Sequence, residues 1–529
     1  MNNEQYPAQR TDQKFLSSTA LVMAAFVLSR VLGLVREALL GSAFGAGTDM
    51  DAFRAASRVT ETLYVLVAGG ALGSAFIPTF TAYLARDERK MAWQVASAVI
   101  NLVVLIALLA ATAAFAAAPW LVSTVLAPSF APETRALTVS LLRWMLASTV
   151  IFSAGGLLMG ILNANNHFLL PALAPSFYNL GIIIGAVLLA RWWGIYGVAA
   201  GTVLGALLHL LVQLPALRRL DGTYSPILGL RLAGVREVGR LMLPRVLGLA
   251  ITELQFWVNT NLGSRIPVTG VVSALTWGWR LMLLPQGIFA QALATVAFPS
   301  FSAQAARGEK EALRSAIATV LGLVLFLTLP ATVGLLVLGR PLVEMLFMRG
   351  EFDRTAAAMV TWALAWYAIG LAAHSGLEIV TRAFYALHDT ATPVWVGGAA
   401  MALNVAFSIL FSHLFSQFGA AALAGYQPWM PLGGLALANS VATTLETLAL
   451  TWLLRRRLDG LAEKQLWDSL WRTAVGAAAM GAVLWLCLAW VPTRHAWILG
   501  GGGMIIGMGT FLLAALLLKS PEIKWILRR

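Results

Sequence analysis

Long apolar segments follow one another along almost the entire chain, with short polar connections between them. A helix needs about 20 apolar residues to cross roughly 30 Å of hydrocarbon, and segments of this length recur throughout. They lie at roughly 17–44, 53–84, 93–121, 136–162, 168–192, 195–217, 238–262, 270–303, 311–338, 356–386, 392–415, 430–454, 469–491 and 496–518. The pattern predicts an all-α polytopic membrane protein with about 14 transmembrane helices.

The first two predicted spans carry ionisable residues at positions where lipid would be expected. Arg30, Arg36 and Glu37 lie within the first span, and an ionisable residue at the bilayer centre costs roughly 2.5–3.5 kcal/mol. In the second span, charged residues at i, i+3, i+7 and i+10 form one stripe along a helix: Asp51, Arg54, Arg58 and Glu61. Such residues usually face a polar cavity. The alternative is that they are structural pairs, Arg36 with Glu37 or Glu61.

Composition supports the membrane interpretation. With 59% apolar and only 12% charged residues, a soluble globular domain is excluded. The net charge of +13 comes from cations that gather in the connections, where they orient the spans and meet anionic membrane lipids. Nucleic acid is therefore not an expected partner. A single cysteine, Cys487, cannot form an intramolecular disulfide.

The connections alternate between rich and poor in positive charge. The rich set contains Arg10, Lys14, Arg86, Arg89, Lys90, Arg218, Arg219, Arg231, Arg236, Arg240, Arg307, Lys310, Arg314, Arg455, Arg456, Arg457, Lys464, Lys519, Lys524, Arg528 and Arg529. The poor set contains Arg191, Arg265, Arg340 and Arg494. The positive-inside rule then predicts that both termini are cytoplasmic. Residues 16–28 also have the length of a signal-peptide core, but apolar sequence continues past Arg30 and Arg36, which favours a retained span.

A six-span unit is duplicated in the sequence. Ser29-Arg-Val-Leu-Gly-Leu34 returns 215 residues later as Pro244-Arg-Val-Leu-Gly-Leu249, and Ala75-Phe-Ile-Pro78 returns at a proline offset of 221 as Ala297-Phe-Pro299. Chance repetition of apolar strings is the alternative, but an arginine and prolines anchor the matches. We therefore predict two parallel lobes related by an axis along the membrane normal. The predicted segments are an N-lobe at 1–220, a cytoplasmic linker at 221–237, a C-lobe at 238–457 and two extra C-terminal spans at 458–529.

Two lobes with a charged seam are typical of transporters, in which the substrate site lies between the repeats and the lobes rock around it. No soluble segment is long enough for an ATPase or transferase domain, so we do not expect an enzyme. The six histidines show no ligand spacing, and neither a cofactor nor a histidine metal site is indicated. His374 and Glu378, one turn apart, could relay a proton; a structural pair near Arg382 is the alternative.

Several motifs are more specific than the composition. They are Ser29-Arg30-Val-Leu-Gly33-Leu-Val-Arg36-Glu37, Phe44-Gly-Ala-Gly47, Asp51-Ala-Phe53, Gly160-Ile-Leu-Asn163-Ala, Pro171-Ala-Leu-Ala-Pro175 with Asn179, and Arg382-Ala-Phe-Tyr-Ala-Leu387-His-Asp389-Thr-Ala-Thr-Pro393. Through nearly its whole length the chain resembles the MurJ/MviN family, which belongs to the multidrug/oligosaccharidyl-lipid/polysaccharide exporter superfamily. The resemblance implies that fold and a flippase for lipid II, the lipid-linked peptidoglycan precursor, in the bacterial inner membrane.

The resemblance also implies site residues. By match of motif, the substrate-binding residues are Arg30, Arg36, Asp51 and Arg280, with Ser29, Glu37, Arg54, Arg58, Glu61 and Tyr64 as weaker candidates. The last two spans resemble an extra pair that lines a groove for the lipid tail. Two positions depart from the family pattern, because Tyr64 replaces a common arginine and Gly69 replaces an acidic residue. Some relatives bind sodium in the second lobe, and Asn259 and Asn404 could contribute to such a site here, with polar packing as the alternative.

The chemistry of the implied substrate agrees with arginines in the membrane. Guanidinium groups bind diphosphate oxygens bidentately and stay charged when dehydrated. An exporter of another lipid-linked oligosaccharide or of a drug is one alternative, although cation-exporting drug antiporters need acidic cavities. A non-transporting scaffold for cell-envelope synthesis is the other, and scaffolding does not require a charged seam. Lipid II, membrane lipids and cell-wall synthesis proteins are the expected partners.

Overall fold

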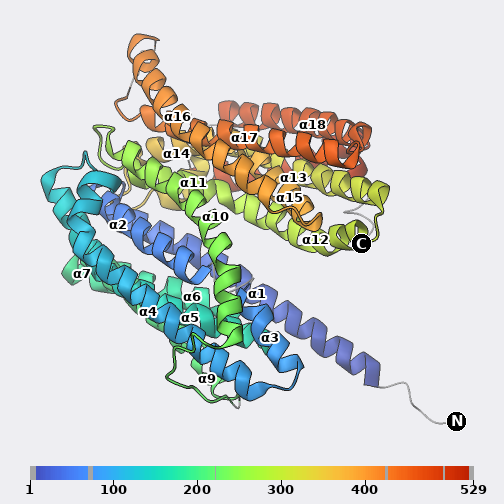
Figure 1. Cartoon of the computed structure of the whole chain (residues 1–529). Coiled ribbons are helices and arrows are strands. Elements are labelled where there is room, and N and C mark those ends of the chain that lie inside the picture. The colour runs from blue at the N-terminus through green and yellow to red at the C-terminus, as the bar shows by residue number, and fades with distance from the viewer. Residues whose placement is uncertain (1–6, 70–74, 221, 423–426, 492–494, 524–529) are drawn as a thin grey trace. The chain divides into compact units, whose positions relative to one another are not determined.

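The computed structural model describes residues 7–69, 75–220, 222–422, 427–491 and 495–523, and every regular element in these ranges is a helix (Figure 1). The chain divides into two compact units, Met1–Trp257 and Val258–Arg529. The predicted all-α class is confirmed. Of the charges used to predict the topology, Arg494, Lys524, Arg528 and Arg529 lie outside the described residues.

The first unit contains helices of very different lengths, several of which are interrupted by π-helical turns, labelled η. Its elements are α1 (Pro7–Phe44), α2 (Thr48–Tyr64), η1 (Val65–Gly69), α3 (Ile77–Ala85), α4 (Arg89–Trp120), η3 (Leu121–Leu126), α5 (Pro132–Ala164), α6 (Leu169–Ile184), η4 (Gly185–Leu189), α7 (Ala190–Trp193), α8 (Ile195–Leu211) and α9 (Leu214–Leu217). Helix α10 (Ala233–Ser264) begins in the first unit and ends in the second.

The second unit is built mainly from long helices. Its elements are α11 (Val271–Pro285), η5 (Gln286–Ala290), α12 (Gln291–Ala306), α13 (Lys310–Phe347), α14 (Arg354–Ile369), α15 (Leu371–Ala386), α16 (Ala391–Ala422), α17 (Pro431–Leu458), α18 (Glu463–Trp490), η6 (Ile498–Gly502) and α19 (Gly503–Leu517). The boundary between the units falls within α10, whereas the sequence places a linker at 221–237. The four predicted segments stay a prediction.

The predicted number of 14 spans is not confirmed. Within the described ranges, nine helices are long and apolar enough to cross a membrane, and two helix pairs bent by 45° raise the number to 11 if each pair is one span. The remaining three predicted segments fall on α1, on α2 to α3 and on α17, which are outside this set. Their charged and polar residues, such as the stripe on α2, lower the apolar character on which the criterion depends.

Helices α6 and α8 pack backbone to backbone. Glycines one turn apart on one helix, Gly181 and Gly185, face glycines one turn apart on the other, Gly201 and Gly205. A Cβ atom added at Gly181 would lie 2.2 Å from the Cα atom of Gly205, which is closer than any side chain tolerates. Small residues at this spacing allow helices to approach closely in a membrane, where apolar burial gives no driving force. The contact fixes α6, which carries Asn179.

Two of the π-helical turns in the described ranges, η1 and η5, lie at equivalent points of the predicted duplication. In the first unit η1 comes directly after α2 and begins at Val65, and in the second η5 comes directly after α11 and begins at Gln286. These starts are 221 residues apart, the same offset as between Pro78 and Pro299. π-Helical turns often occur at functional sites. The second predicted span of each copy is therefore interrupted at an equivalent point.

The outer surfaces are apolar. Large side chains with more than half of their surface exposed occur on α1, α4, α16 and α19, among them Phe26, Leu109, Trp395, Ile505 and Leu517. Helices α18 and α19 pack on each other and on α13, with Phe326, Leu484 and Phe511 in their shared core. Exposed apolar surface of this extent is unfavourable in water and expected in lipid.

Candidate functional site

A buried cluster of charges joins α1 and α2 in the first unit. The Nη2 atom of Arg36 lies 2.5 Å from one carboxylate oxygen of Glu37. The other oxygen of Glu37 accepts a hydrogen bond from Nη2 of Arg54 on α2. One carboxylate therefore holds two guanidinium groups from two helices, and all three side chains are largely buried. We call Arg36, Glu37 and Arg54 the arginine cluster.

Asn179 on α6 orients the arginine cluster from a third helix. Its Oδ1 atom accepts a hydrogen bond of 2.9 Å from Nη1 of Arg36. Its Nδ2 atom donates to the backbone carbonyl of Ser29, at 3.2 Å. Asn179 is itself buried. The amide therefore ties one face of α1 to α6 and fixes the direction in which the Arg36 guanidinium points.

The arginine cluster carries excess positive charge. Its three side chains, two guanidinium cations and one carboxylate, sum to a charge of +1, and the carboxylates of Asp51 and Glu61 lie on the same helix as Arg54. The buried Nε atom of Arg36 has no hydrogen-bond partner among the described residues, so this group retains a donor. Because charge-assisted hydrogen bonds from guanidinium groups are strong and directional, the cluster is chemically suited to an anion.

A second polar group lies towards the end of α2. Arg58 pairs with Glu61 at 3.2 Å, and its guanidinium lies 4.5 Å from the centre of the Phe256 ring on α10. Thr62 donates a 2.8 Å hydrogen bond to Glu253 and accepts one of 2.8 Å from the indole of Trp257. The stripe on α2 thus continues from the buried Asp51 and Arg54 to the partly exposed Glu61.

The other predicted residues of the first unit are not members of the arginine cluster as defined. Arg30 is exposed on α1, Ser29 is half-buried, and Asp51 is buried in the first turn of α2. Tyr64 packs on Phe152, at 5.3 Å between ring centres. Tyr64, which stands where the family commonly has an arginine, therefore makes an aromatic contact.

The second unit holds Arg280 and a polar pocket. Arg280 is half-buried on α11, next to Trp279, whose ring packs against His374 at 5.3 Å. His374 is hydrogen-bonded to Asn439 at 2.9 Å, and Arg382 pairs with Glu378 at 2.6 Å. His374, Glu378 and Arg382 line a pocket of about 430 Å³ together with Gln286, and Arg280 is not among the residues that line it. The observed contacts join His374 to Asn439 and Glu378 to Arg382, so neither the proton relay nor the structural pair of His374 with Glu378 is confirmed.

No metal centre is indicated by acidic, histidine or cysteine side chains. The described residues contain no group of three or more such side chains that could hold a metal ion. Asn259 and Asn404 are both buried, and the Oδ1 atom of each has no hydrogen-bond partner among the described residues. Their contribution to a cation site stays a prediction.

Sequence reasoning missed residues that complete the first site. Asn179 appeared only within a motif, since nothing in the sequence shows that it contacts Arg36, 143 residues away. Glu253 was overlooked although it interrupts an apolar segment, which is the signal that identified Arg30 and Arg36. Thr62 and Trp257 have no comparable signal.

Solved structures with the same fold are membrane transport proteins. The chain matches "Lipid II flippase MurJ, inward closed conformation" with a TM-score of 0.78 and 24% identity, over 95% of this chain and 100% of that one. A multidrug resistance MATE family transporter of the MOP superfamily matches with a TM-score of 0.65 and 15% identity, over 84% and 99%. The fold is that of a polytopic helical exporter, as the sequence predicts.

The family is narrower than this class. The family model for "Lipid II flippase MurJ" matches residues 40–501. A probable lipid II flippase MurJ of Vibrio cholerae is 30% identical over 97% of both chains, and a lipid II flippase MurJ of Burkholderia cenocepacia is 31% identical over 82% of both. The chain belongs to the lipid II flippase MurJ family.

Proposed function

We propose that this chain is a flippase that moves lipid II from the cytoplasmic to the outer leaflet of the bacterial inner membrane by alternating access. The observation that carries the proposal is membership of the lipid II flippase MurJ family over residues 40–501. It is supported by relatives matched over 97% and 82% of their length. Alternating access needs two repeats, and in this proposal the duplicated segments of the sequence supply them.

The arginine cluster is the proposed binding group for the diphosphate. Lipid II offers several anionic oxygens, and a buried cluster with a net charge of +1 attracts them. Glu37 keeps the two guanidinium groups charged and in place when no anion is bound. Arg30 and Arg280 contribute further positive charge, and Asp51, Arg58 and Glu61 balance the charge along α2. Ser29 and Tyr64 are further candidates for contact with the substrate.

The arrangement in the membrane follows from the charge pattern. Both termini are cytoplasmic in this proposal, and the last two spans line a groove for the lipid tail. Cysteines placed beside Arg86, Arg218, Arg307 or Arg455 should then resist an impermeant thiol reagent in intact spheroplasts. Labelling at these positions from outside would contradict the topology. Cell-wall synthesis proteins are proposed partners.

Rescue of a bacterial strain depleted of its own lipid II flippase tests the proposed function. Expression of this chain should restore growth and the appearance of lipid II in the outer leaflet. A strain that lacks an exporter for a different lipid-linked oligosaccharide serves as the matched comparison, and it should not be rescued. Rescue of only the second strain would assign the chain to another substrate. Rescue of neither, with folded protein in the membrane, would favour a scaffold.

A further inference from the structure

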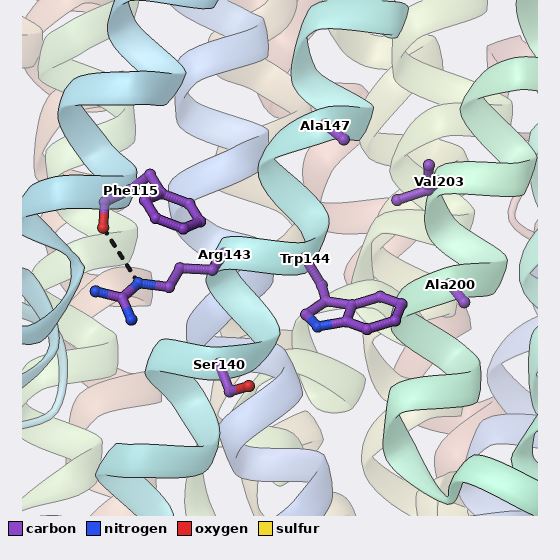
Figure 2. A pocket seen from close by; sticks show the side chains of 7 residues that line it. All are labelled: Phe115, Ser140, Arg143, Trp144, Ala147, Ala200 and Val203. Carbon is purple, nitrogen blue, oxygen red and sulfur yellow. Dashed lines mark hydrogen bonds between the residues drawn. The ribbon is translucent and has the colours of Figure 1, made fainter.

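A groove on the first unit lies apart from the arginine cluster, between α4, α5 and α8 (Figure 2). Its volume is about 560 Å³. The walls combine one cation with aromatic and small apolar side chains: Phe115, Ser140, Arg143, Trp144, Ala147 and Ala200. In Figure 2 the side chains of Arg143 and Phe115 point towards each other, and that of Trp144 points towards α8. The groove therefore has a charged side and an apolar side.

Arg143 is a cation within a predicted span. Helix α5 is among those long and apolar enough to cross a membrane. The Nε atom of Arg143 donates a hydrogen bond of 3.3 Å to the carbonyl of Phe115, and the guanidinium lies 4.8 Å from the centre of the Phe115 ring. Within the described ranges no carboxylate pairs with Arg143. An arginine in a span without a carboxylate partner is costly unless an anion is available to it.

The groove lies near one end of its helices. Exposed tryptophans lie at the last residues of α4 and α7, Trp120 and Trp193, and such residues favour the level of the lipid headgroups. The helix that holds Trp120 continues through η3 to Leu126, and Arg143 lies eleven residues, roughly 16 Å, from the start of α5. Phe115 precedes Trp120 by five residues and therefore lies roughly 8 Å below that level. The Arg143 guanidinium lies beside Phe115, and from there a long arginine side chain reaches the lipid phosphates by extending towards the interface.

We propose that this groove is a binding site for an anionic phospholipid of the surrounding membrane. The phosphate accepts hydrogen bonds from the Arg143 guanidinium and from the hydroxyl of Ser140, one turn away on α5. One acyl chain lies along Trp144 and over the small side chains of Ala147 and Ala200. A single guanidinium matches the single charge of a phosphodiester, whereas a diphosphate carries more charge than one arginine can balance.

Binding of defined lipids to the purified full chain tests the site. Native mass spectrometry in neutral detergent would measure binding of dioleoyl phosphatidylglycerol and of phosphatidylcholine with the same acyl chains. The wild-type chain should prefer phosphatidylglycerol. Arg143→Gln should weaken phosphatidylglycerol binding roughly tenfold or more, because charge-assisted hydrogen bonds are lost, and Arg143→Lys should restore it in part. Arg191→Gln is the matched control, since Arg191 is exposed on α7 and does not line the groove.

Several outcomes would overturn the proposal. Equal binding of the two phospholipids by the wild-type chain would show that the groove does not select charge. Unchanged binding in Arg143→Gln, or an equal loss in Arg191→Gln, would remove Arg143 from the site. Tighter Arg143-dependent binding of undecaprenyl phosphate than of phosphatidylglycerol would assign the groove to an isoprenoid phosphate instead. Thermal unfolding of each variant, together with Arg143→Lys, separates loss of binding from loss of folding.

Discussion

The ion pairs of Glu37 in the first unit and of Glu378 in the second are built in different ways. In the first, Glu37 on α1 binds its neighbour Arg36 and also Arg54 on α2, and the Glu37 and Arg54 side chains are only 6% and 4% exposed. In the second, Glu378 and Arg382 lie one turn apart on the single helix α15, and their side chains are 29% and 26% exposed. The Glu37 pairs link two helices, whereas the Glu378 pair lies within one helix.

The difference decides what each group can contribute. A shared, buried carboxylate fixes the position of one helix against another, and its removal leaves cations buried without a partner. A partly solvated pair within one helix adds a few tenths of a kcal/mol and holds no other element in place. We therefore expect folding of the first unit, and the geometry of its arginines, to depend on Glu37 far more than the second unit depends on Glu378.

The largest effect is expected for Glu37→Gln. The substitution keeps the shape of the side chain but removes the negative charge that two buried guanidinium groups share, and breaking a buried ion pair in this way costs about 3–5 kcal/mol. Folded protein in the membrane and the thermal unfolding midpoint should both fall. The double variant Glu37→Gln with Arg54→Gln should recover part of the loss. A midpoint unchanged from wild type would show that the carboxylate is not structural.

A smaller effect is expected for Asn179→Leu. It removes the hydrogen bonds to Arg36 and to the Ser29 carbonyl and should cost about 1–3 kcal/mol. Flipping per folded molecule should fall as well, because the Arg36 guanidinium loses its orientation. Asn439→Leu removes the partner of His374 in the second unit and is the matched control. Flipping per folded molecule should be higher in Asn439→Leu than in Asn179→Leu. Equal flipping by the two variants would erase the proposed difference between the units.

Asp389 offers a pH test outside the spans. Partial burial alone would raise the pKa of Asp389, but hydrogen bonds from Thr392 and the nearby Arg457 hold that pKa below its ordinary value. A depressed carboxyl pKa stabilises the folded state above the unfolded pKa of about 4, and this contribution disappears as the pH falls through the lower folded value. Asp389→Asn should thus lower stability by about 1 kcal/mol at pH 7. The deficit should vanish in strong acid, and a deficit independent of pH would exclude the mechanism.

The smallest effect is expected for Glu378→Gln. The pair with Arg382 spans i to i+4 and is partly solvated, so its loss should cost only about 0.3–0.5 kcal/mol. The thermal unfolding midpoint should move little relative to wild type, in contrast to Glu37→Gln. A loss as large as that of Glu37→Gln would mean that the second unit depends on an equally structural carboxylate.

Much of the fold could be predicted from the sequence, because apolar length and periodicity are local properties. The stripe from Asp51 to Glu61 is spaced along one helix, α2, and the possible pairing of Arg36 with Glu37 follows from their adjacency. Contacts between helices could not be predicted. The hydrogen bond from Arg54 to Glu37 depends on how the chain turns from α1 into α2. The hydrogen bond from Arg36 to Asn179 depends on the packing of α1 against α6.

The predicted number of spans is not confirmed, for a different reason. Counting apolar segments treats α1, α2 and α17 like the others, although within the described ranges these three are not among the helices long and apolar enough to cross a membrane. Residues that make a membrane helix less apolar are those on which a binding site depends. Sequence reasoning is therefore least certain about spans in the region where function is most concentrated.

Lipid II flipping per folded protein molecule tests the central claim most directly, in membranes that carry Arg30→Ala, Arg36→Ala or Arg280→Ala. Each substitution removes charge-assisted hydrogen bonds worth about 1.5–3 kcal/mol, which corresponds to a roughly ten- to hundredfold loss of affinity. We expect reduced flipping in each variant, with partial rescue by Lys because the charge returns without the bidentate geometry. Full flipping per folded molecule in all three Ala variants would contradict a mechanism in which arginines hold the diphosphate.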